Sequence, residues 1–216
     1  RILVSIEGHE LSSLDPEIYR KKEGIYELSF NNDIYNFDSI LTIKRLRLPD
    51  EVYMLTLDNI GFEGFSFTKE YLFLGLENLQ KHESGFSDST LIYILNKKTN
   101  ILKIIGKKEL GISTICGLYS VDDYNLYGID RNRKNVFHIN FDENFDVNEV
   151  KTMKLELSIP LHPDINNIIG IAPESITFDY NNNFYVSIVP WKEIYKPDMA
   201  QKKQLSLEEL NKFYEF

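Results

Sequence analysis

The chain has 216 residues, of which 43% are hydrophobic and 26% charged, and its formal net charge is −9. This composition is typical of a globular protein with a substantial core and argues against disorder. The negative charge argues against nucleic acid as a partner, because phosphate binding needs a basic face. No apolar run approaches the roughly 18 residues that span a membrane. The single cysteine, Cys116, excludes an internal disulfide.

Short segments rich in aromatic and aliphatic residues recur along the chain, and each predicts a β-strand. The first half is expected to form strands at 1–7, 24–30, 39–48, 64–68, 71–77, 90–96 and 101–107. The second half is expected to form strands at 115–123, 124–130, 135–141, 149–157, 173–183 and 183–189. The good helix signal lies near the C-terminus, where Ser206 is expected to cap a short helix with Leu207, Leu210 and Phe213 at helical spacing.

The strands form a repeat. Superposing the second strand of each unit aligns Glu7, Glu77, Asp130 and Val189, and superposing the first strands aligns Glu63, Cys116 and Glu174. The interval from Glu77 to Asp130 is 53 residues, and so is the interval from Glu63 to Cys116. A period in the fifties with four short strands per unit is typical of a β-propeller blade.

We therefore predict an all-β protein, a β-propeller of four-stranded antiparallel blades that is partial or truncated and carries a short C-terminal helix. The single domain is divided into a partial blade at 1–50, blades at 51–108 and 109–157, and a partial blade with the helix at 158–216. Propellers close with about four to eight blades. We expect the chain to be a fragment, or its N-terminal strand to close the ring, or self-association or a protein partner to complete it.

Several segments resemble the esterase-like phytase family of β-propellers. The sequence NIGFEG at 59–64 is similar to that family's N-x-G-F-E-G-hydrophobic motif, and 71–77 stands where the family has its L-Y-hydrophobic-A-hydrophobic segment. The segment at 130–132 is similar to its E-R-D segment, and 173–176 to its N-x-E-G-hydrophobic motif. VSIEG at 4–8, followed by a polar insertion and GIYELSF, also matches a family feature.

The chain departs from the family pattern in three ways. Ser175 replaces a glycine, Asp130 replaces a glutamate, and the family's N-terminal blade is absent. The resemblance implies a phytase-like or esterase-like activity on a small ester or anionic substrate. We also expect a periplasmic or extracellular location.

Acidic residues end several of the predicted strands. The innermost strands of a propeller line its channel, so these acids should meet near one mouth, where they repel one another unless a cation is bound. Oxygen ligands of this kind suit calcium. We predict a calcium-assisted site for phosphate or carboxylic esters, with the metal held by Glu7, Glu77 and Asp130. The predicted catalytic residues are Glu63, Glu174, Arg131, which would contact substrate oxygens, and His9 as a general base.

Three alternatives remain open. The acids could accept hydrogen bonds from adjacent blades and hold the blades together. The protein could be a non-catalytic scaffold that presents the loops at 8–22 and 80–89 to a protein or glycan. It could also be a lactonase of the gluconolactonase type, although the sequence assigns no Asn and Asp ligand set. Cys116 is expected to be a packed small residue rather than a nucleophile.

Overall fold

The computed structural model describes residues 2–8, 16–30, 40–57, 60–79, 81–82, 85–86, 89–157 and 168–192. The first sheet contains β1 (Ile2–Ile6), β2 (Gly24–Phe30) and β3 (Ile40–Arg45). The second contains β4 (Gly64–Phe67), β5 (Tyr71–Gly75), β8 (Ile92–Asn96) and β9 (Leu102–Ile105). The third contains β10 (Gly117–Ser120), β11 (Asn125–Asp130), β12 (Asn135–Phe141) and β13 (Val147–Lys154). The fourth pairs β14 (Ile168–Phe178) with β15 (Phe184–Lys192), and β6 (Lys81–His82) pairs with β7 (Gly85–Phe86).

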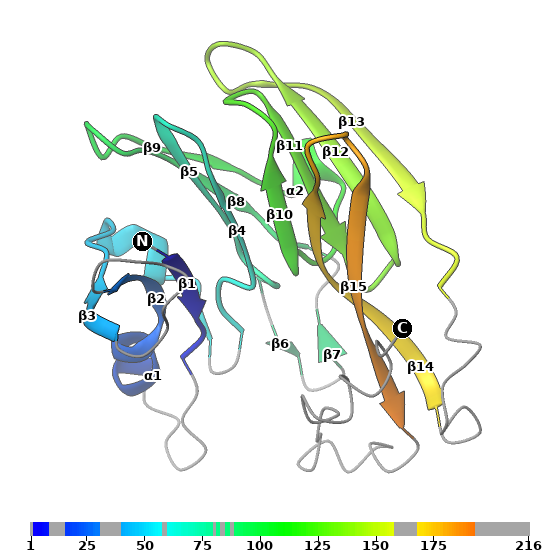
Figure 1. Cartoon of the computed structure of the whole chain (residues 1–216), viewed down its shortest axis with the longest axis horizontal. Coiled ribbons are helices and arrows are strands. Elements are labelled where there is room, and N and C mark those ends of the chain that lie inside the picture. The colour runs from blue at the N-terminus through cyan, green and yellow to red at the C-terminus, as the bar shows by residue number, and fades with distance from the viewer. Residues whose placement is uncertain are drawn as a thin grey trace.

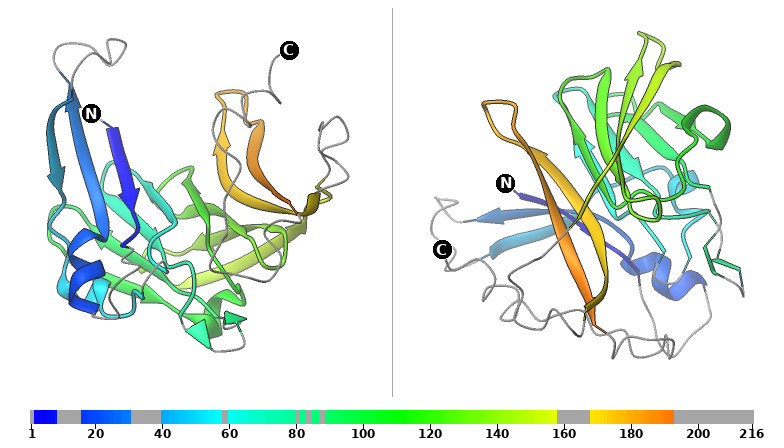
Figure 2. Two further views of the ribbon diagram at one scale, coloured as in Figure 1. Left: turned by 90° about the horizontal axis from the view of Figure 1, so that it is seen from below. Right: turned by 90° about the vertical axis from the view of Figure 1, so that its right-hand side faces the viewer.

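The four main sheets follow one another along an arc, as Figures 1 and 2 show. Strand β10 lies between β4 and β14, so the first strands of three successive sheets are neighbours at the inside of the arc. The hydroxyl oxygens of Ser66 on β4 and Ser120 on β10 are 2.8 Å apart. Antiparallel sheets arranged in this way are propeller blades. The predicted fold class is therefore confirmed, while the predicted C-terminal helix lies outside the described residues.

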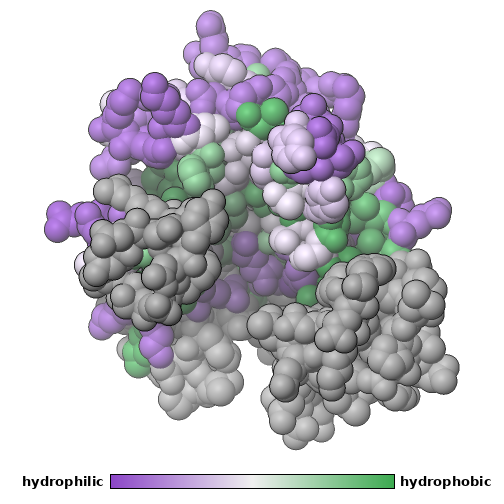
Figure 3. All heavy atoms as spheres, in the orientation of Figure 1, coloured by the Kyte–Doolittle hydropathy of each residue, from purple (hydrophilic) through white to green (hydrophobic). Residues whose placement is uncertain are grey.

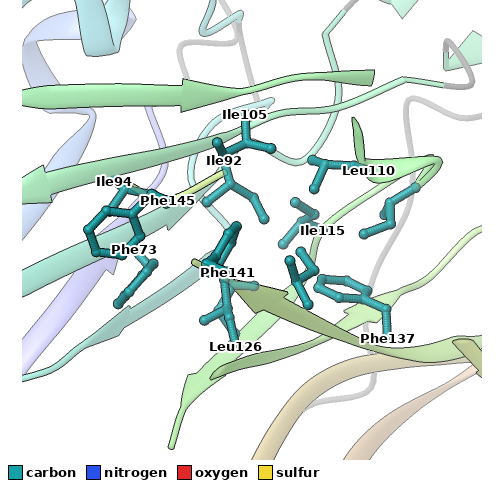
Figure 4. Packing of buried hydrophobic residues seen from close by; sticks show 13 residues of the cluster. Phe73, Ile92, Ile94, Ile105, Leu110, Ile115, Leu126, Phe137, Phe141 and Phe145 are labelled. Carbon is teal, nitrogen blue, oxygen red and sulfur yellow. The ribbon is translucent and has the colours of Figure 1, made fainter. Parts of the chain in front are cut away.

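The core fills the spaces between successive sheets. One cluster lies between the second and third sheets, and Figure 4 shows Phe73, Phe137 and Phe141 within it. A second cluster joins the first sheet to the second and includes Phe62 and Tyr93, whose rings meet edge to face with centroids 5.8 Å apart. A third, smaller cluster joins the third sheet to the fourth. Apolar burial between faces of successive sheets therefore sets the spacing of the blades.

The helical elements are short: α1 (Pro16–Lys22), η1 (Asp50–Tyr53) and α2 (Lys107–Leu110). The sequence interpretation placed α1 in a polar loop, and that interpretation is wrong. Pro16 occupies the first helical position, where its missing N–H costs nothing. Seven residues are too few to show a clear helical period. Among the described residues, no helix is both long and apolar enough to cross a membrane.

Candidate functional site at the inner edge of the sheets

Three residues occupy equivalent positions on the inner strands β4, β10 and β14. Gly64 and Gly117 begin β4 and β10, and Ser175 follows the irregularity within β14; each pairs with the adjacent strand of its own sheet. The residues just before them are Glu63, Cys116 and Glu174. The structure brings these three together, with one ligand atom from each lying within 4.8 Å of the others. The three residues that the sequence alignment of the first strands placed together are therefore also neighbours in the structure.

The alignment of the second strands, which placed Glu77 with Asp130, needs a correction. Gly64 pairs with Gly75, and its equivalent Gly117 pairs with Ile129. Two residues beyond these partners lie Glu77 and Arg131. The alignment that placed Asp130 opposite Glu77 is therefore wrong by one residue, because the β10–β11 turn is one residue longer than the β4–β5 turn.

Asp130 lies apart from the acidic cluster and serves local structure. Its side chain is buried. Its oxygens accept hydrogen bonds from Ser113 N at 3.0 Å, Ser113 Oγ at 2.7 Å, Thr114 Oγ1 at 3.1 Å and Arg133 N at 3.2 Å. These bonds tie the end of β11 to the segment that precedes β10. All these partners belong to the predicted blade that contains Asp130, so Asp130 stabilises its own blade and does not connect adjacent blades.

Arg131 lies at the centre of the cluster and links three sheets. Its Nη2 contacts Glu77, and its Nη1 lies 3.1 Å from Glu174 Oε2 and 3.4 Å from Glu63 Oε2. The arginine side chain is only 17% exposed, so these ion pairs are well shielded from water. Burial alone would lower the pKa of Arg131, but the acidic groups around it raise the pKa above its usual value. The guanidinium therefore stays charged.

Glu7, Glu63 and Glu77 form a second group that shares Glu63 with the first. One carboxylate oxygen from each lies within 4.8 Å of the others. Glu7 is oriented by a hydrogen bond of 2.5 Å from Gly61 N to its Oε1. Glu63 Oε2 is buried and accepts no hydrogen bond within the described part of the chain. In the space-filling view, hydrophilic atoms are visible deep in the hollow between the sheets (Figure 3).

The geometry of this group fits a calcium ion. Calcium binds oxygen at about 2.3–2.6 Å, so two oxygens on the same ion are at most about 5 Å apart. The three carboxylates satisfy that limit without rearrangement. The buried oxygen Oε2 of Glu63 makes a long ion pair with Arg131, at 3.4 Å, and no hydrogen bond with a described residue, so it keeps the capacity to bind a metal ion.

Burial raises the pKa of every carboxyl group of the cluster, and repulsion from neighbouring carboxylates adds to this effect for Glu7, Glu63 and Glu77. Burial, reinforced by Glu77, raises the pKa of Glu7 to about 7. Burial also raises the pKa of Glu63 to about 7, against the opposing effect of Arg131. The pKa of Glu77 is raised to about 7 by burial and by the charge of Glu63. Burial raises the pKa of Glu174 as well. Without a bound cation, the cluster therefore exchanges protons near neutral pH.

Cys116 lies inside this cluster without the properties of a nucleophile. Its side chain is buried, and burial together with the charge of Glu63 raises the pKa of its thiol well above the usual value. The thiol lies within 4.8 Å of a carboxyl oxygen of Glu63 and of Glu174. This environment agrees with the expectation of a packed residue, since reactive thiols need a lowered pKa.

Two further residues complete the account of the site. His9, predicted as a general base, lies outside the described residues. Glu23 was not singled out from the sequence, yet it is fully buried and accepts hydrogen bonds from Gly8 N at 2.7 Å and Phe62 N at 3.1 Å. It stands in a polar stretch that looked solvated, and no motif marks it.

Comparisons with known proteins give distant similarities. A luciferin-regenerating enzyme is 16% identical, with a TM-score of 0.44 over 78% of this chain and 52% of that one. A periplasmic gluconolactonase of Pseudomonas aeruginosa is 14% identical, with a TM-score of 0.48 over 94% of this chain and 52% of that one. A protein from Lactobacillus plantarum is 12% identical, with a TM-score of 0.48 over 94% and 51%.

The chain spans about half the length of these solved structures. At this level of similarity they carry no argument about activity. No family model matches the chain, and no curated protein matches it. Membership of the esterase-like phytase family stays a prediction.

Proposed function

We propose that the protein is a divalent-cation-dependent hydrolase of phosphate or carboxylic esters, phytase-like or esterase-like in its chemistry, whose metal is calcium. Glu7, Glu63 and Glu77 would hold the ion. The observation that carries the proposal is the convergence of their oxygens within 4.8 Å around a buried Glu63 oxygen that lacks a hydrogen bond. Glu63, predicted as a catalytic residue, here takes the place of Asp130 beside Glu7 and Glu77, because the oxygens of Asp130 accept hydrogen bonds from Ser113 and Thr114.

The charge balance of the cluster favours a cation. Four carboxyl groups, Glu7, Glu63, Glu77 and Glu174, surround a single guanidinium, that of Arg131. When all four are ionised, three negative charges remain uncompensated. A buried excess of this size is costly, so the groups either bind protons, as their raised pKa values indicate, or bind a cation.

The residues of the chain would have the following roles in ester hydrolysis. A bound divalent cation would polarise a substrate oxygen and activate water. Arg131, held by Glu77 and Glu174, would orient a substrate oxygen with a charge-assisted hydrogen bond. Glu174, whose pKa is raised by burial, would keep its proton to a higher pH than an exposed carboxyl group and would serve as a general acid. His9 stays a candidate general base.

Calcium titration calorimetry tests the metal site. The parent protein is expected to bind one calcium ion, and Glu63→Gln is expected to weaken binding at least tenfold, because it removes a charged oxygen ligand. Glu143→Gln, at an exposed position, is the matched control and should bind as the parent does. If the parent binds no divalent cation, the proposal fails.

Hydrolysis assays test the activity. We expect the parent to hydrolyse 4-nitrophenyl phosphate or 4-nitrophenyl acetate with calcium and to lose that activity with a chelator. A simple δ-lactone belongs in the same panel, since a lactonase remains an open alternative. Equal rates for the parent and Glu63→Gln on every substrate would contradict the assignment.

The competing function is a non-catalytic propeller scaffold. The ion pairs of Arg131 favour it, because they connect three sheets and would brace the blades in a protein without any activity. A scaffold is expected to show neither calcium binding nor turnover in the two experiments above.

A further inference from the structure

A basic pocket lies outside the acidic cluster, between α1, the segment that follows β3, and η1. Its volume is about 630 Å³, which falls within the range of small-molecule sites. Among the residues that the structure describes, the charged lining consists of Arg20, Lys21, Arg45 and Arg47 with one acid, Asp50. In a chain with a net charge of −9, four basic side chains around one cavity are a local reversal of charge. Such a reversal favours an anionic ligand.

The guanidinium groups in this pocket are held in place by the protein. Arg45 donates from Nη2 to Arg20 O at 3.0 Å, and its guanidinium stacks over the Tyr53 ring at 4.6 Å. Arg20 donates from Nη2 to Met54 O at 2.9 Å. Arg45 Nε is buried and finds no acceptor among the residues that the structure describes. Fixed cations with donor capacity left lose little entropy when an anion binds.

The rest of the lining is largely apolar. Leu46, Leu48 and Met54 line the cavity together with Tyr53. The ligand that fits must therefore carry concentrated negative charge at one end and an apolar group at the other. Guanidinium groups pair with phosphoryl oxygens through charge-assisted hydrogen bonds. We infer that this pocket binds a phosphate monoester with an apolar or aromatic substituent.

This site is independent of the acidic cluster. Glu23 is the buried acid that interacts with Arg45, and its carboxylate is already engaged by the N–H groups of Gly8 and Phe62. It offsets part of the charge of Arg45 and does not belong to the acidic cluster around Arg131. The result of the hydrolysis assays therefore neither supports nor contradicts the inference about this pocket.

Isothermal titration calorimetry with phenyl phosphate tests the inference. The parent is expected to bind one equivalent, more weakly as sodium chloride is raised. Arg47→Gln and Lys21→Gln remove exposed cations of the pocket and are each expected to raise Kd about tenfold. Lys69→Gln removes an exposed cation at the β4–β5 turn and should leave Kd unchanged. Absence of binding at millimolar concentration, or equal effects of all three variants, overturns the inference.

Two further titrations separate this pocket from other sources of binding. Inorganic phosphate is expected to bind at least tenfold more weakly than phenyl phosphate, because it leaves the apolar lining unfilled. Equal affinity for the two would overturn the assignment of an apolar substituent. Glu63→Gln should bind phenyl phosphate as the parent does, whereas loss of binding in that variant would place the anion at the acidic cluster instead.

Discussion

Calcium affinity is expected to rise steeply between pH 6 and pH 8. The pKa values of Glu7, Glu63 and Glu77 are each raised to about 7, so calcium must displace protons from the cluster. A group with a pKa of about 7 is about 9% ionised at pH 6 and about 91% ionised at pH 8, a tenfold change. One displaced proton therefore predicts about a tenfold gain in affinity, and three predict about a thousandfold gain.

Calorimetry in two buffers with different ionisation enthalpies measures this effect directly. The apparent binding enthalpy should depend on the buffer at pH 7, and the dependence gives the number of protons released. Glu63→Gln should release fewer protons than the parent, while Glu143→Gln should release as many. If calcium binds with an affinity that changes less than twofold from pH 6 to pH 8, and with no proton release, the carboxyl groups are not its ligands.

Four further predictions concern stability, measured by urea denaturation with a chelator present. Stability should fall as the pH rises from 4.5 through 7, because the folded protein keeps protons that the unfolded chain has released. The loss is on the order of 3 kcal/mol for each of Glu7, Glu63 and Glu77. The Glu63→Gln variant should show a smaller fall if this explanation is right. Arg131→Gln should destabilise by about 3–5 kcal/mol at pH 8 and less at pH 6, since it leaves buried carboxylates unpaired; equal losses at both pH values would contradict the charge argument. Asp130→Asn should cost about 1–3 kcal/mol and leave calcium affinity unchanged, whereas a tenfold loss of affinity would make it a ligand. Gly117→Ala should cost about 1–3 kcal/mol, because its Cβ would lie 2.7 Å from Ser175 Cα, while Gly106→Ala, with nothing nearer than 3.8 Å, should be tolerated.

The strands could be predicted from the sequence because alternating aromatic and aliphatic runs carry their own signal. The grouping of Glu63, Cys116 and Glu174 could be predicted as well. Glu63 and Cys116 directly precede β4 and β10, and Glu174 lies at the irregularity of β14, so each stands next to the inner-strand residue that pairs with its own sheet. Burial was harder to predict. Glu23 follows two lysines in the sequence, and its burial depends on hydrogen bonds from the N–H groups of Gly8 and Phe62. These residues are distant in the sequence, so no local pattern predicts the contacts.

The position of Arg131 could not be predicted from the spacing of motifs, because it depends on turn length. The longer β10–β11 turn moves each later residue of the third sheet one position relative to the second. As a result, a guanidinium rather than the carboxylate of Asp130 takes the place equivalent to Glu77. If Asp130 stood there, the cluster would hold five acids and no internal cation. One residue in a surface turn therefore decides whether the inner edge of these sheets is a purely acidic ring or an acidic ring with a built-in positive charge. That charge pairs with Glu63, Glu77 and Glu174, so Glu7 is the carboxyl group of the cluster that Arg131 compensates least.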